Sequence, residues 1–441
     1  MLQTMRNAWK ITDLRHKILF TLVIILLYRL GNAVPVPYVN IDALNSYFSQ
    51  MQNTVLGLLN VMSGGAFSNA TIFALSIQPY INASIIIQLL CIAIPALERM
   101  SKEEGEEGKK KIASITRYTT VAIGLIQGFA YYYMIMKSQF LTADGQGVWA
   151  AIVIILTFTS GSALIMWLGE QITDKGVGNG ISLVLLFNIL SSVPSDFQTL
   201  YIRFISGKNV ATMVVAAIII VAAIIGLVVF TIILNDAQRT IPVQYSRRVQ
   251  GRGLVGGQSS NIPLKVNTAS VMPVIFASSL MTMPVVVGQI IKVDYSTIPG
   301  QILMALNSGS WCNPDRPIYS IGLVIYILLL YFFAYFYTSI SFNPLEIANN
   351  MKKQGGFIPG IRPGKPTSDY LDNILTYIIF IGATGLAIVA IIPIFISGVF
   401  NVGRISFAGT SLIIIVGVVL ETVKAIESQM VVRNYQGFLN D

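Results

Sequence analysis

The fold is decided by residues 60–95, which read NVMSGGAFSNATIFALSIQPYINASIIIQLLCIAIP. The polar first part, residues 60–76, contains the adjacent glycines Gly64 and Gly65. It cannot face lipid as a spanning helix, because its serine, asparagine and threonine side chains would lose water and glycine is a poor helix former. Irregular backbone at membrane depth is tolerated only where it lines water or is buried in protein, so this stretch indicates a cavity or pore.

The composition of the chain indicates a polytopic membrane protein. Of its 441 residues, 54% are hydrophobic and 11% are charged, whereas soluble domains average about 25% charged residues. One histidine and two cysteines leave little material for metal or redox chemistry. Cys91 lies in an apolar run and Cys312 in a distant polar loop, so no disulfide is expected.

Ten apolar runs are predicted to cross the membrane as helices, since about 30 Å of hydrocarbon takes roughly 20 residues. The first run has a basic leader and a Gly-Asn-Ala sequence that resembles a signal-peptidase site, but nine later spans favour a retained anchor. The predicted spans lie at about 18–34, 77–95, 118–136, 148–168, 181–193, 210–234, 271–291, 318–340, 374–396 and 405–420.

The distribution of lysine and arginine predicts the orientation of these spans. With the N-terminus in the cytoplasm, cytoplasmic segments hold 22 of the 29 basic residues, outer loops hold six, and Arg29 lies in the first span. Cytoplasmic loops carry the excess of basic residues in membrane proteins, so both termini are expected in the cytoplasm. The net charge of +9 therefore does not by itself indicate a nucleic-acid ligand, although the basic loops could touch ribosomal RNA.

The cytoplasmic segment 235–270 has the pattern of a hairpin. Apolar residues alternate on both sides of a glycine-rich centre at 251–257. Arginine pairs carboxylates and phosphates bidentately, so these arginines could bind an acidic partner. They could equally be part of the usual excess of positive charge in cytoplasmic loops. Both interpretations stay open. The alternating residues are Ile241, Val243, Tyr245, Ile262, Leu264 and Val266, and the arginines are Arg239, Arg247, Arg248 and Arg252.

The cytoplasmic segment 341–372 contains KKQGGFIPGIRPGKPT at 352–367. Its glycines and prolines forbid a long helix and favour a fixed irregular shape with Arg362 near the tip. A flexible linker would not need this many basic and apolar residues, so docking is favoured.

Segment 98–117, with its mixed charges, is interpreted as a solvated helix start. Segment 169–180 is interpreted as a tight turn, because no strand precedes its glycines as a phosphate cradle requires.

Ionisable residues are nearly absent from the predicted spans. Arg29 is the exception, and near the outer end of its span it is expected to snorkel to the surface. No span contains histidine or aspartate, so neither a proton relay nor a membrane protease is indicated. The sequence supplies no residues for enzymatic activity.

A short motif repeats near the start of the second and seventh predicted spans. The pattern P-x-I-x-A-S begins at Pro79 and again at Pro273. The two copies occupy the same place in two five-span halves, and because five is odd the second half must be inverted. Ligand or conduit sites lie between inverted repeats near the membrane midplane.

With these residues assembled, the chain resembles the SecY family of protein-conducting channels. The matching motifs are spread over nearly the whole chain, whereas the outer loops at 139–148 and 291–316 add nothing to the resemblance. The motifs are SGGAFSNATIFALSIQPYINASIIIQLL (63–90), GVGNGISL (176–183), IPVQYSRRVQGRGLVGGQSSNIPLKVN (241–267), MPVIFASS (272–279), NPLEIANNMKKQGGFIPGIRPGKPT (343–367) and RNYQGF (433–438).

The resemblance implies an all-α polytopic membrane protein with ten transmembrane helices in two inverted five-helix halves. The halves, residues 1–200 and 201–441, would form a clamshell around a central pore. A short re-entrant plug helix at about 55–74 would close the pore. A lateral gate would lie between the second and third spans on one side and the seventh and eighth on the other.

The resemblance also assigns roles to particular residues. The plug residues would be Asn60, Ser63, Gly64, Gly65, Phe67 and Ser68. The pore ring would be Ile81, Ile85, Ile181, Leu185, Ile275 and Ile414. The lateral gate would include Ile86, Gln88, Gln127, Ser278, Ser279 and Thr282. The docking site for SecA or a ribosome would include Arg247, Arg248, Arg252, Lys352, Lys353 and Arg362.

The spacing of the ring residues agrees with these roles. Ile81 and Ile85 are four residues apart, as are Ile181 and Leu185, so each pair lies on one helix face. Apolar rings of this kind gate a pore by dewetting. Without the resemblance, core packing or lipid contact would be the better interpretation of each residue.

The function implied by the resemblance is that of the central channel subunit of the general secretion translocase in the bacterial cytoplasmic membrane. It would pass unfolded preproteins through the pore and release signal sequences and transmembrane segments sideways into membrane lipid, without cofactor or catalysis. The driving force would come from a partner, because the sequence has no nucleotide-binding signature. Expected partners are SecE-like and SecG-like subunits, the SecA motor ATPase, a translating ribosome and preprotein signal sequences.

Two other classes of protein were weighed. A secondary solute transporter should carry charges or ion ligands near the midplane, and the predicted spans lack them. A scaffold that only docks cytosolic factors would not need a polar segment that returns into the membrane. The channel is therefore the leading hypothesis.

Overall fold

The structure is a computed structural model that describes most of the chain. The described residues are 6, 8–50, 55–102, 105–202, 210–245, 248–250, 253–255, 259–291, 293–294, 296–312, 317–400 and 410–437. They are mostly helical, with short strands confined to two segments between helices. The polytopic membrane class predicted from composition and the all-α fold implied by the resemblance are both confirmed.

Ten helices among the described residues correspond, in order, to the ten predicted spans. Six of them meet length and hydropathy requirements for crossing a membrane, while α5 and α11 contain shorter apolar helices. Several helices extend beyond their apolar runs. The ten are α2 (Thr12–Gly31), α5 (Gln78–Ala93), α7 (Gly105–Lys137), α8 (Val148–Lys175), α9 (Gly180–Leu200), α10 (Val210–Asp236), α11 (Met272–Ile291), α13 (Ile321–Ser341), α15 (Lys365–Phe400) and α16 (Thr410–Gly437).

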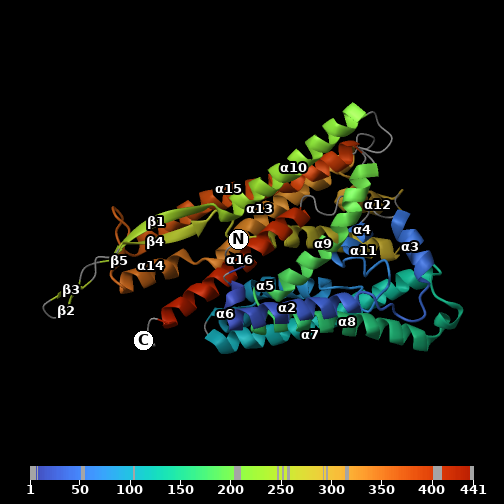
Figure 1. Cartoon of the computed structure of the whole chain (residues 1–441), viewed down its shortest axis with the longest axis horizontal. Coiled ribbons are helices and arrows are strands. Elements are labelled where there is room, and N and C mark those ends of the chain that lie inside the picture. Colours follow the sequence, from blue (N-terminus) through green and yellow to red (C-terminus); the bar gives the residue numbers. More distant parts are fainter. Residues whose placement is uncertain are drawn as a thin grey trace.

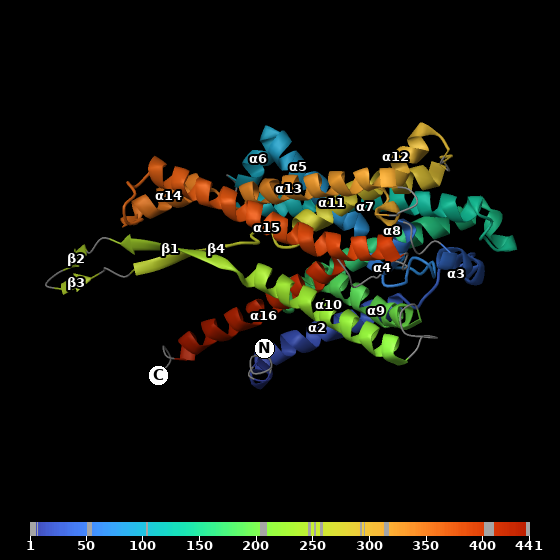
Figure 2. The ribbon, with the colours of Figure 1, turned by 90° about the horizontal axis from the view of Figure 1, so that it is seen from above.

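The helices form an elongated bundle (Figures 1 and 2). In Figure 1, α10, α13 and α15 run along one side of the bundle, and α2, α5, α7 and α8 run along the other. The short helices α3 (Ile41–Gln50) and α12 (Ile298–Leu306) lie at the end opposite the strands in both views. The bundle therefore has the strands at one end and the short helices α3 and α12 at the other.

The first and last helices pack together near their terminal ends. Leu14 of α2 and Ile426 of α16 belong to one small apolar cluster. Lys17 Nζ donates to Gln429 Oε1 at 3.1 Å. The described ends of the chain therefore lie on the same side of the bundle, as an even number of spans requires.

The predicted hairpin between α10 and α11 is confirmed. Strands β1 (Gln238–Tyr245) and β4 (Ser259–Lys265) pair antiparallel, with Ile241 opposite Ile262. The ribbon extends through β2 (Arg248–Gln250) and β3 (Gly253–Val255). Ile241, Val243 and Leu264 are buried, since the period of two places these side chains on the protein-facing side.

The segment between α13 and α15 joins this hairpin. It begins with the helix α14 (Pro344–Lys353), which is capped by Asn343 Oδ1 accepting from Glu346 N at 3.3 Å. The following strand β5 (Gly356–Phe357) pairs antiparallel with β1. The two segments that the sequence analysis treated separately therefore form a single three-stranded unit.

The tight turn predicted at 169–180 is shorter than expected. Helix α8 continues to Lys175, so only residues 176–179 connect it to α9. Asn179 Oδ1 accepts from Ile181 N and Ser182 N and thereby caps α9. A Cβ atom on Gly180 would lie 2.0 Å from the Gly169 carbonyl oxygen, so glycine is required for this close approach.

Candidate functional site

The polar stretch that precedes α5 is folded back into the protein. Its first residues form the end of the short helix α4 (Val55–Met62), and the chain then continues in turns to Ile77. Ser63, Ser68, Thr71 and Ser76 are all buried. The prediction that this stretch is not a lipid-facing span is confirmed, and of the two settings open to it the structure has burial in protein.

Polar side chains of the stretch replace the hydrogen bonds that a regular helix would provide. Asn60 Oδ1 accepts from Ser68 N at 2.8 Å. Ser63 Oγ accepts from Phe67 N at 3.0 Å and donates to the Asn60 carbonyl at 2.9 Å. Gly64 and Gly65 have φ of 66° and 85°, a conformation that favours glycine. Buried irregular backbone must satisfy its polar groups, which explains these residue types.

Aromatic packing fixes the stretch against α7 and α8. The ring of Phe67 stacks on Tyr131 of α7 with centroids 4.3 Å apart, and the Tyr131 hydroxyl donates to the Phe67 carbonyl. Tyr131 in turn packs against Phe158 of α8. Gly161 of α8 lies so close to the Ile72 carbonyl that a Cβ atom there would clash with it. The outer side of the stretch is tied to α3, where Asn45 Nδ2 donates to Asn69 Oδ1 at 2.9 Å.

A buried asparagine on α9 bonds to both ends of the stretch. Asn188 Nδ2 donates to the Met62 carbonyl at 2.9 Å and to Ser76 Oγ at 3.1 Å. Its Oδ1 accepts from the hydroxyl of Tyr28 on α2 at 2.7 Å. The sequence analysis missed Asn188, although a single amide inside the apolar run at 183–190 was the signal available.

Arg29 of α2 takes part in the same region. Its guanidinium donates to the carbonyl of Phe187 on α9, and a Cβ atom on Gly64 would lie 2.9 Å from its Nη1. The expectation that Arg29 snorkels to the outer surface is therefore wrong. The side chain turns inward because a backbone acceptor on α9 is within reach.

The six residues of the predicted pore ring all belong to, or pack against, the large apolar cluster that forms the main core of the bundle. They come from four helices, α5, α9, α11 and α16. Ile81, Leu185, Ile275 and Ile414 expose no more than 7% of their surface, and Ile85 and Ile181 are half-buried against the same cluster. Met62, the last residue of α4, also packs against this cluster. The predicted ring residues therefore share the main apolar core of the bundle with Met62 and with many other side chains.

The residues of the predicted lateral gate lie on three helices. Ile86 and Gln88 are on α5, Gln127 is on α7, and the remaining three are on α11. Ile86 is exposed, and the other five are half-buried. Helix α11 contacts α7. The gate residues on α11 are Ser278, Ser279 and Thr282.

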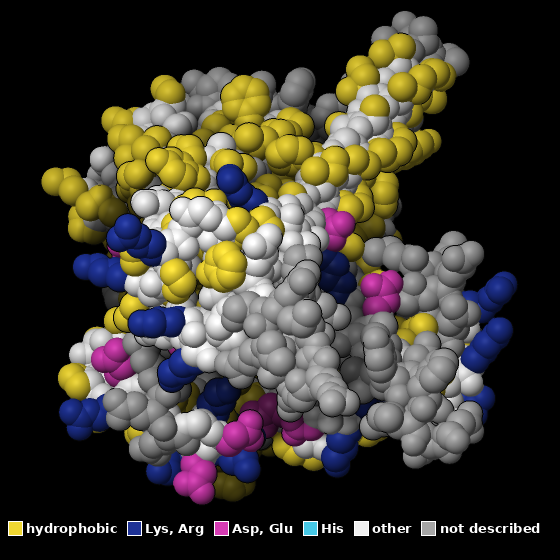
Figure 3. Space-filling view, turned by 90° about the vertical axis from the view of Figure 1, so that its left-hand side faces the viewer, with side chains coloured by type: hydrophobic (Ala, Val, Ile, Leu, Met, Phe, Trp, Pro, Cys, Tyr) yellow, Lys and Arg dark blue, Asp and Glu magenta, His cyan; other side chains and the backbone are white. Residues whose placement is uncertain are grey.

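The residues of the predicted docking surface are partly described. Arg362 is exposed in a turn whose shape is fixed by Thr367 Oγ1 donating to the Arg362 carbonyl at 2.8 Å. Lys352 and Lys353 are exposed in the last turn of α14, and Arg248 lies on β2. Arg247 and Arg252 lie outside the described residues. Figure 3, which views the end bearing the strands, shows many lysine and arginine side chains on this face.

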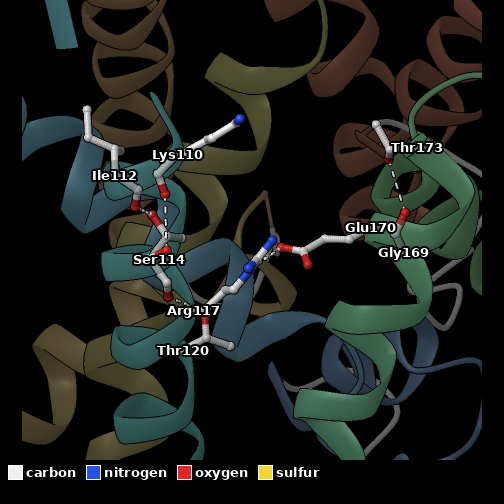
Figure 4. Close-up of polar contacts among 9 residues, drawn as sticks. Lys110, Ile112, Ser114, Arg117, Thr120, Gly169, Glu170 and Thr173 are labelled. Atoms are coloured by element: carbon white, nitrogen blue, oxygen red, sulfur yellow. Dashed lines mark hydrogen bonds and ion pairs between the residues drawn. The ribbon is translucent and has the colours of Figure 1, made fainter. Parts of the chain in front are cut away.

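An ion pair that the sequence analysis missed joins α7 to α8 (Figure 4). Arg117 Nε lies 2.9 Å from Glu170 Oε1. Both residues fall just outside the apolar runs, but the two helices continue through them. The preceding residue, Gly169, faces Ile181 of the predicted ring, since a Cβ atom on Gly169 would lie 3.1 Å from the Ile181 Cγ1.

Within the described part of the chain, no group of three or more histidine, cysteine, aspartate or glutamate side chains could hold a metal ion. Cys91 and Cys312 are free thiols, as the sequence analysis expected. The candidate site therefore consists of an apolar cluster, a polar stretch and a basic surface.

These features define a class of protein, a multi-pass helical membrane protein in which a polar segment is folded back and buried within the bundle. The SecY family model matches residues 71–423. The chain belongs to the SecY family.

Curated relatives named protein translocase subunit SecY match the chain over its full length. Those from Streptomyces galbus and Streptomyces scabiei are 43% and 41% identical, each with 100% of both chains covered. The relative from Halalkalibacterium halodurans is 40% identical with the same coverage.

Solved structures of channels share the fold. One described as the structure of a protein conducting channel has a TM-score of 0.61 at 18% identity, covering 94% of this chain and 92% of that chain. The canine Sec61 of a ribosome-channel complex has a TM-score of 0.60 at 16% identity, covering 94% and 92%. These likenesses support the ten-helix fold predicted from the sequence.

Proposed function

We propose that the chain is the central channel subunit of a general secretion translocase, which passes unfolded preproteins across the membrane. Membership of the SecY family makes it a protein-translocation channel subunit. The observation that supports the detailed proposal is that α4 contacts both α9 and α11 and that Met62 packs against the apolar core to which the six residues belong. Residues at about 55–74 would act as the plug, and the six residues would form the pore ring.

The proposed resting state is closed by the ring and the plug together. An apolar constriction excludes water and ions by dewetting. It also binds a passing chain weakly, since it offers no specific polar partners. The burial of the ring residues and the contacts of α4 with both α9 and α11 support this arrangement. Helix α9 belongs to the proposed half 1–200 and α11 to the proposed half 201–441, so α4 contacts both halves.

A lateral gate would release apolar segments into lipid. The proposed edges are α5 and α7 on one side and α11 and α13 on the other. An apolar signal segment gains roughly 0.8 kcal/mol for each CH₂ group removed from water, so lipid partition supplies the driving force for its exit. The contact between α11 and α7 supports a closed gate in this state.

The face bearing the strands would receive the cytosolic partner. The pairing of β5 with β1 combines the hairpin and the 341–372 segment into one surface, with Arg362, Lys352 and Lys353 exposed on it. The partner would be the SecA motor ATPase or a translating ribosome. Two structures that share the fold are described as bound to ribosomes, one canine and one from yeast.

The remaining parts of the proposal concern assembly and location. SecE-like and SecG-like subunits would pack beside the bundle, where long apolar helices such as α10 are exposed along their length. The chain would reside in the bacterial cytoplasmic membrane with both termini in the cytoplasm. The small cluster that contains Leu14 and Ile426 supports only that the two ends lie on the same side of the bundle. It would perform no catalysis and bind no cofactor, so a partner would supply the work.

Reconstitution tests the proposal against a solute transporter. The chain is placed in proteoliposomes with its partner subunits and SecA, and a radiolabelled preprotein is added with ATP. Protection of the preprotein from external protease is the expected result. Uptake of a small solute without any preprotein protection would contradict the channel function.

A further inference from the structure

Asn188 on α9 is a polar side chain in an apolar part of the bundle. Its exposure is 0%, and its neighbours along the chain from 183 to 190 are all apolar. A buried amide is costly unless its donors and acceptor are satisfied. Asn188 therefore needs hydrogen-bond partners. It lies outside the family motifs and outside the predicted pore ring, so its partners are the guide to its role.

The amide group is satisfied by three elements at once. Its two hydrogens point to the Met62 carbonyl at 2.9 Å and to Ser76 Oγ at 3.1 Å, and its oxygen accepts from the Tyr28 hydroxyl at 2.7 Å. Ser76 Oγ also lies 3.4 Å from the Met62 carbonyl and donates to it, which closes a small ring of hydrogen bonds. An asparagine supplies two donors and an acceptor in one plane, which no aliphatic side chain can do.

The two donated bonds bracket the folded-back stretch. Met62 ends α4, and Ser76 lies two residues before α5 begins at Gln78. The bond from Tyr28, in contrast, joins α2 to α9 and does not involve the stretch. If the stretch moves away, both donated bonds break, while the acceptor side of the amide stays fixed by Tyr28.

We propose that Asn188 is a latch that holds the plug in its closed position, an inference that rests on the proposed channel function. Tyr28 is a positioning residue that orients the amide so that its donors face the plug. When the plug leaves, entering water replaces the two lost bonds. The net contribution of each buried hydrogen bond is small, so the latch biases the plug toward closure without locking it.

Three variants test separately the two hydrogen bonds that Asn188 donates and the one that it accepts from Tyr28. Asn188→Asp keeps the shape and the acceptor for Tyr28 but places an oxygen opposite the Met62 carbonyl. Asn188→Leu removes both donors and the acceptor. Tyr28→Phe removes only the orienting hydroxyl. Thr231→Val on α10 is the matched control, because Thr231 is equally buried and its hydroxyl donates only within its own helix, to the Leu227 carbonyl at 2.7 Å.

The experiment uses the complete translocase in proteoliposomes. The first readout is the resting permeability to chloride without preprotein, and the second is translocation of a preprotein whose signal sequence is defective. Loss of two buried hydrogen bonds should shift the plug equilibrium about tenfold toward the open position. Asn188→Asp and Asn188→Leu should therefore raise both readouts about tenfold, Tyr28→Phe should raise them less, and Thr231→Val should match the wild type.

The possible failures are distinguishable. Wild-type permeability and wild-type signal-sequence dependence in folded Asn188 variants would overturn the latch, provided that the wild type translocates a normal preprotein. If the wild type translocates no preprotein, the channel function itself is rejected. Thermal unfolding of each purified complex checks the fold. Should Asn188→Leu fail to fold, Ser76→Ala removes the latch partner on the plug side and carries the same prediction.

Discussion

Ser76 and Ser270 adopt the same left-handed backbone conformation, with φ of 50° and 52°, each three residues before the proline at the start of a helix. Each serine N–H donates to the carbonyl three residues earlier, at 2.8 Å and 3.3 Å. The helices that follow, α5 and α11, then present Ile81 and Ile275 at the same distance from the turn. The repeated motif is therefore S-x-x-P-x-I-x-A-S, and its serine shapes the turn that aims each helix.

Substitution of Ser270 tests this turn. Ser270→Val should destabilise the complex by about 1–3 kcal/mol, because a β-branched residue is strained in the left-handed region. Ser270→Gly should be neutral or stabilising by up to about 1 kcal/mol, because glycine adopts this conformation without a steric penalty. Denaturant unfolding of the purified complex measures both. Equal stability of the two variants would show that the turn does not depend on this conformation.

A charge reversal tests the ion pair between Arg117 and Glu170. Each single variant, Arg117→Glu and Glu170→Arg, should lower stability by roughly 0.5–1 kcal/mol, since the pair is partly exposed and screened. The double variant should recover most of the loss. A double-mutant cycle on thermal unfolding gives the coupling energy. A double variant whose loss equals the sum of the single losses would mean that the two charges do not interact.

The docking surface is tested at Arg362. Arg362→Glu should abolish most SecA-driven translocation, because an exposed guanidinium that pairs with an acidic partner becomes a repelling carboxylate. The variant should still insert into the membrane at the wild-type level. Arg99→Glu, which makes the same change at an exposed site on α6 (Pro95–Lys102), is the control and should translocate normally. Normal translocation by Arg362→Glu would reject its role in docking.

Movement of the plug is tested by a covalent restraint. Asn45 and Asn69 are joined by a hydrogen bond of 2.9 Å, so cysteines at both positions should be bridged by a short thiol crosslinker. Cys91 and Cys312 are first replaced by serine. Crosslinking should block preprotein translocation, because the plug is then fixed to α3. Each single-cysteine variant treated with the same reagent should remain active, and free passage through the bridged protein would show that the plug need not move.

The spans and the hairpin were predictable because each depends on a local pattern. Ten apolar runs predicted the ten long helices, and the alternation of apolar residues predicted the hairpin in which Ile241 pairs with Ile262. Strand β5 was not predictable, because two residues are too few to show the alternation of apolar and polar side chains that marks a strand. Gly356 and Phe357 form a strand only because they pair with β1. Helices α7 and α8 extend beyond their apolar runs, and there Arg117 and Glu170 form an ion pair that no local pattern predicts.

The polar contacts around the plug could not be read from the sequence for a different reason. Asn188 bonds to residues 112, 126 and 160 positions away, so no local pattern connects them. Arg29 was assigned to the surface from its position near the end of a span, but a carbonyl on α9 provides an inward acceptor. The six residues of the proposed ring were identified by resemblance alone; they share the main apolar core with many other side chains, so their role stays a prediction.

The central claim, that a preprotein passes through the ring, is tested most directly by photocrosslinking. A photoreactive amino acid is introduced at Ile81 or at Ile275, and a preprotein is stalled partway through the complete translocase. Ile219, which is 62% exposed on the outer face of α10, is the control position. The account predicts crosslinks to the stalled preprotein from Ile81 and Ile275 and none from Ile219. Absence of crosslinks from both ring positions while the preprotein is demonstrably stalled would contradict it.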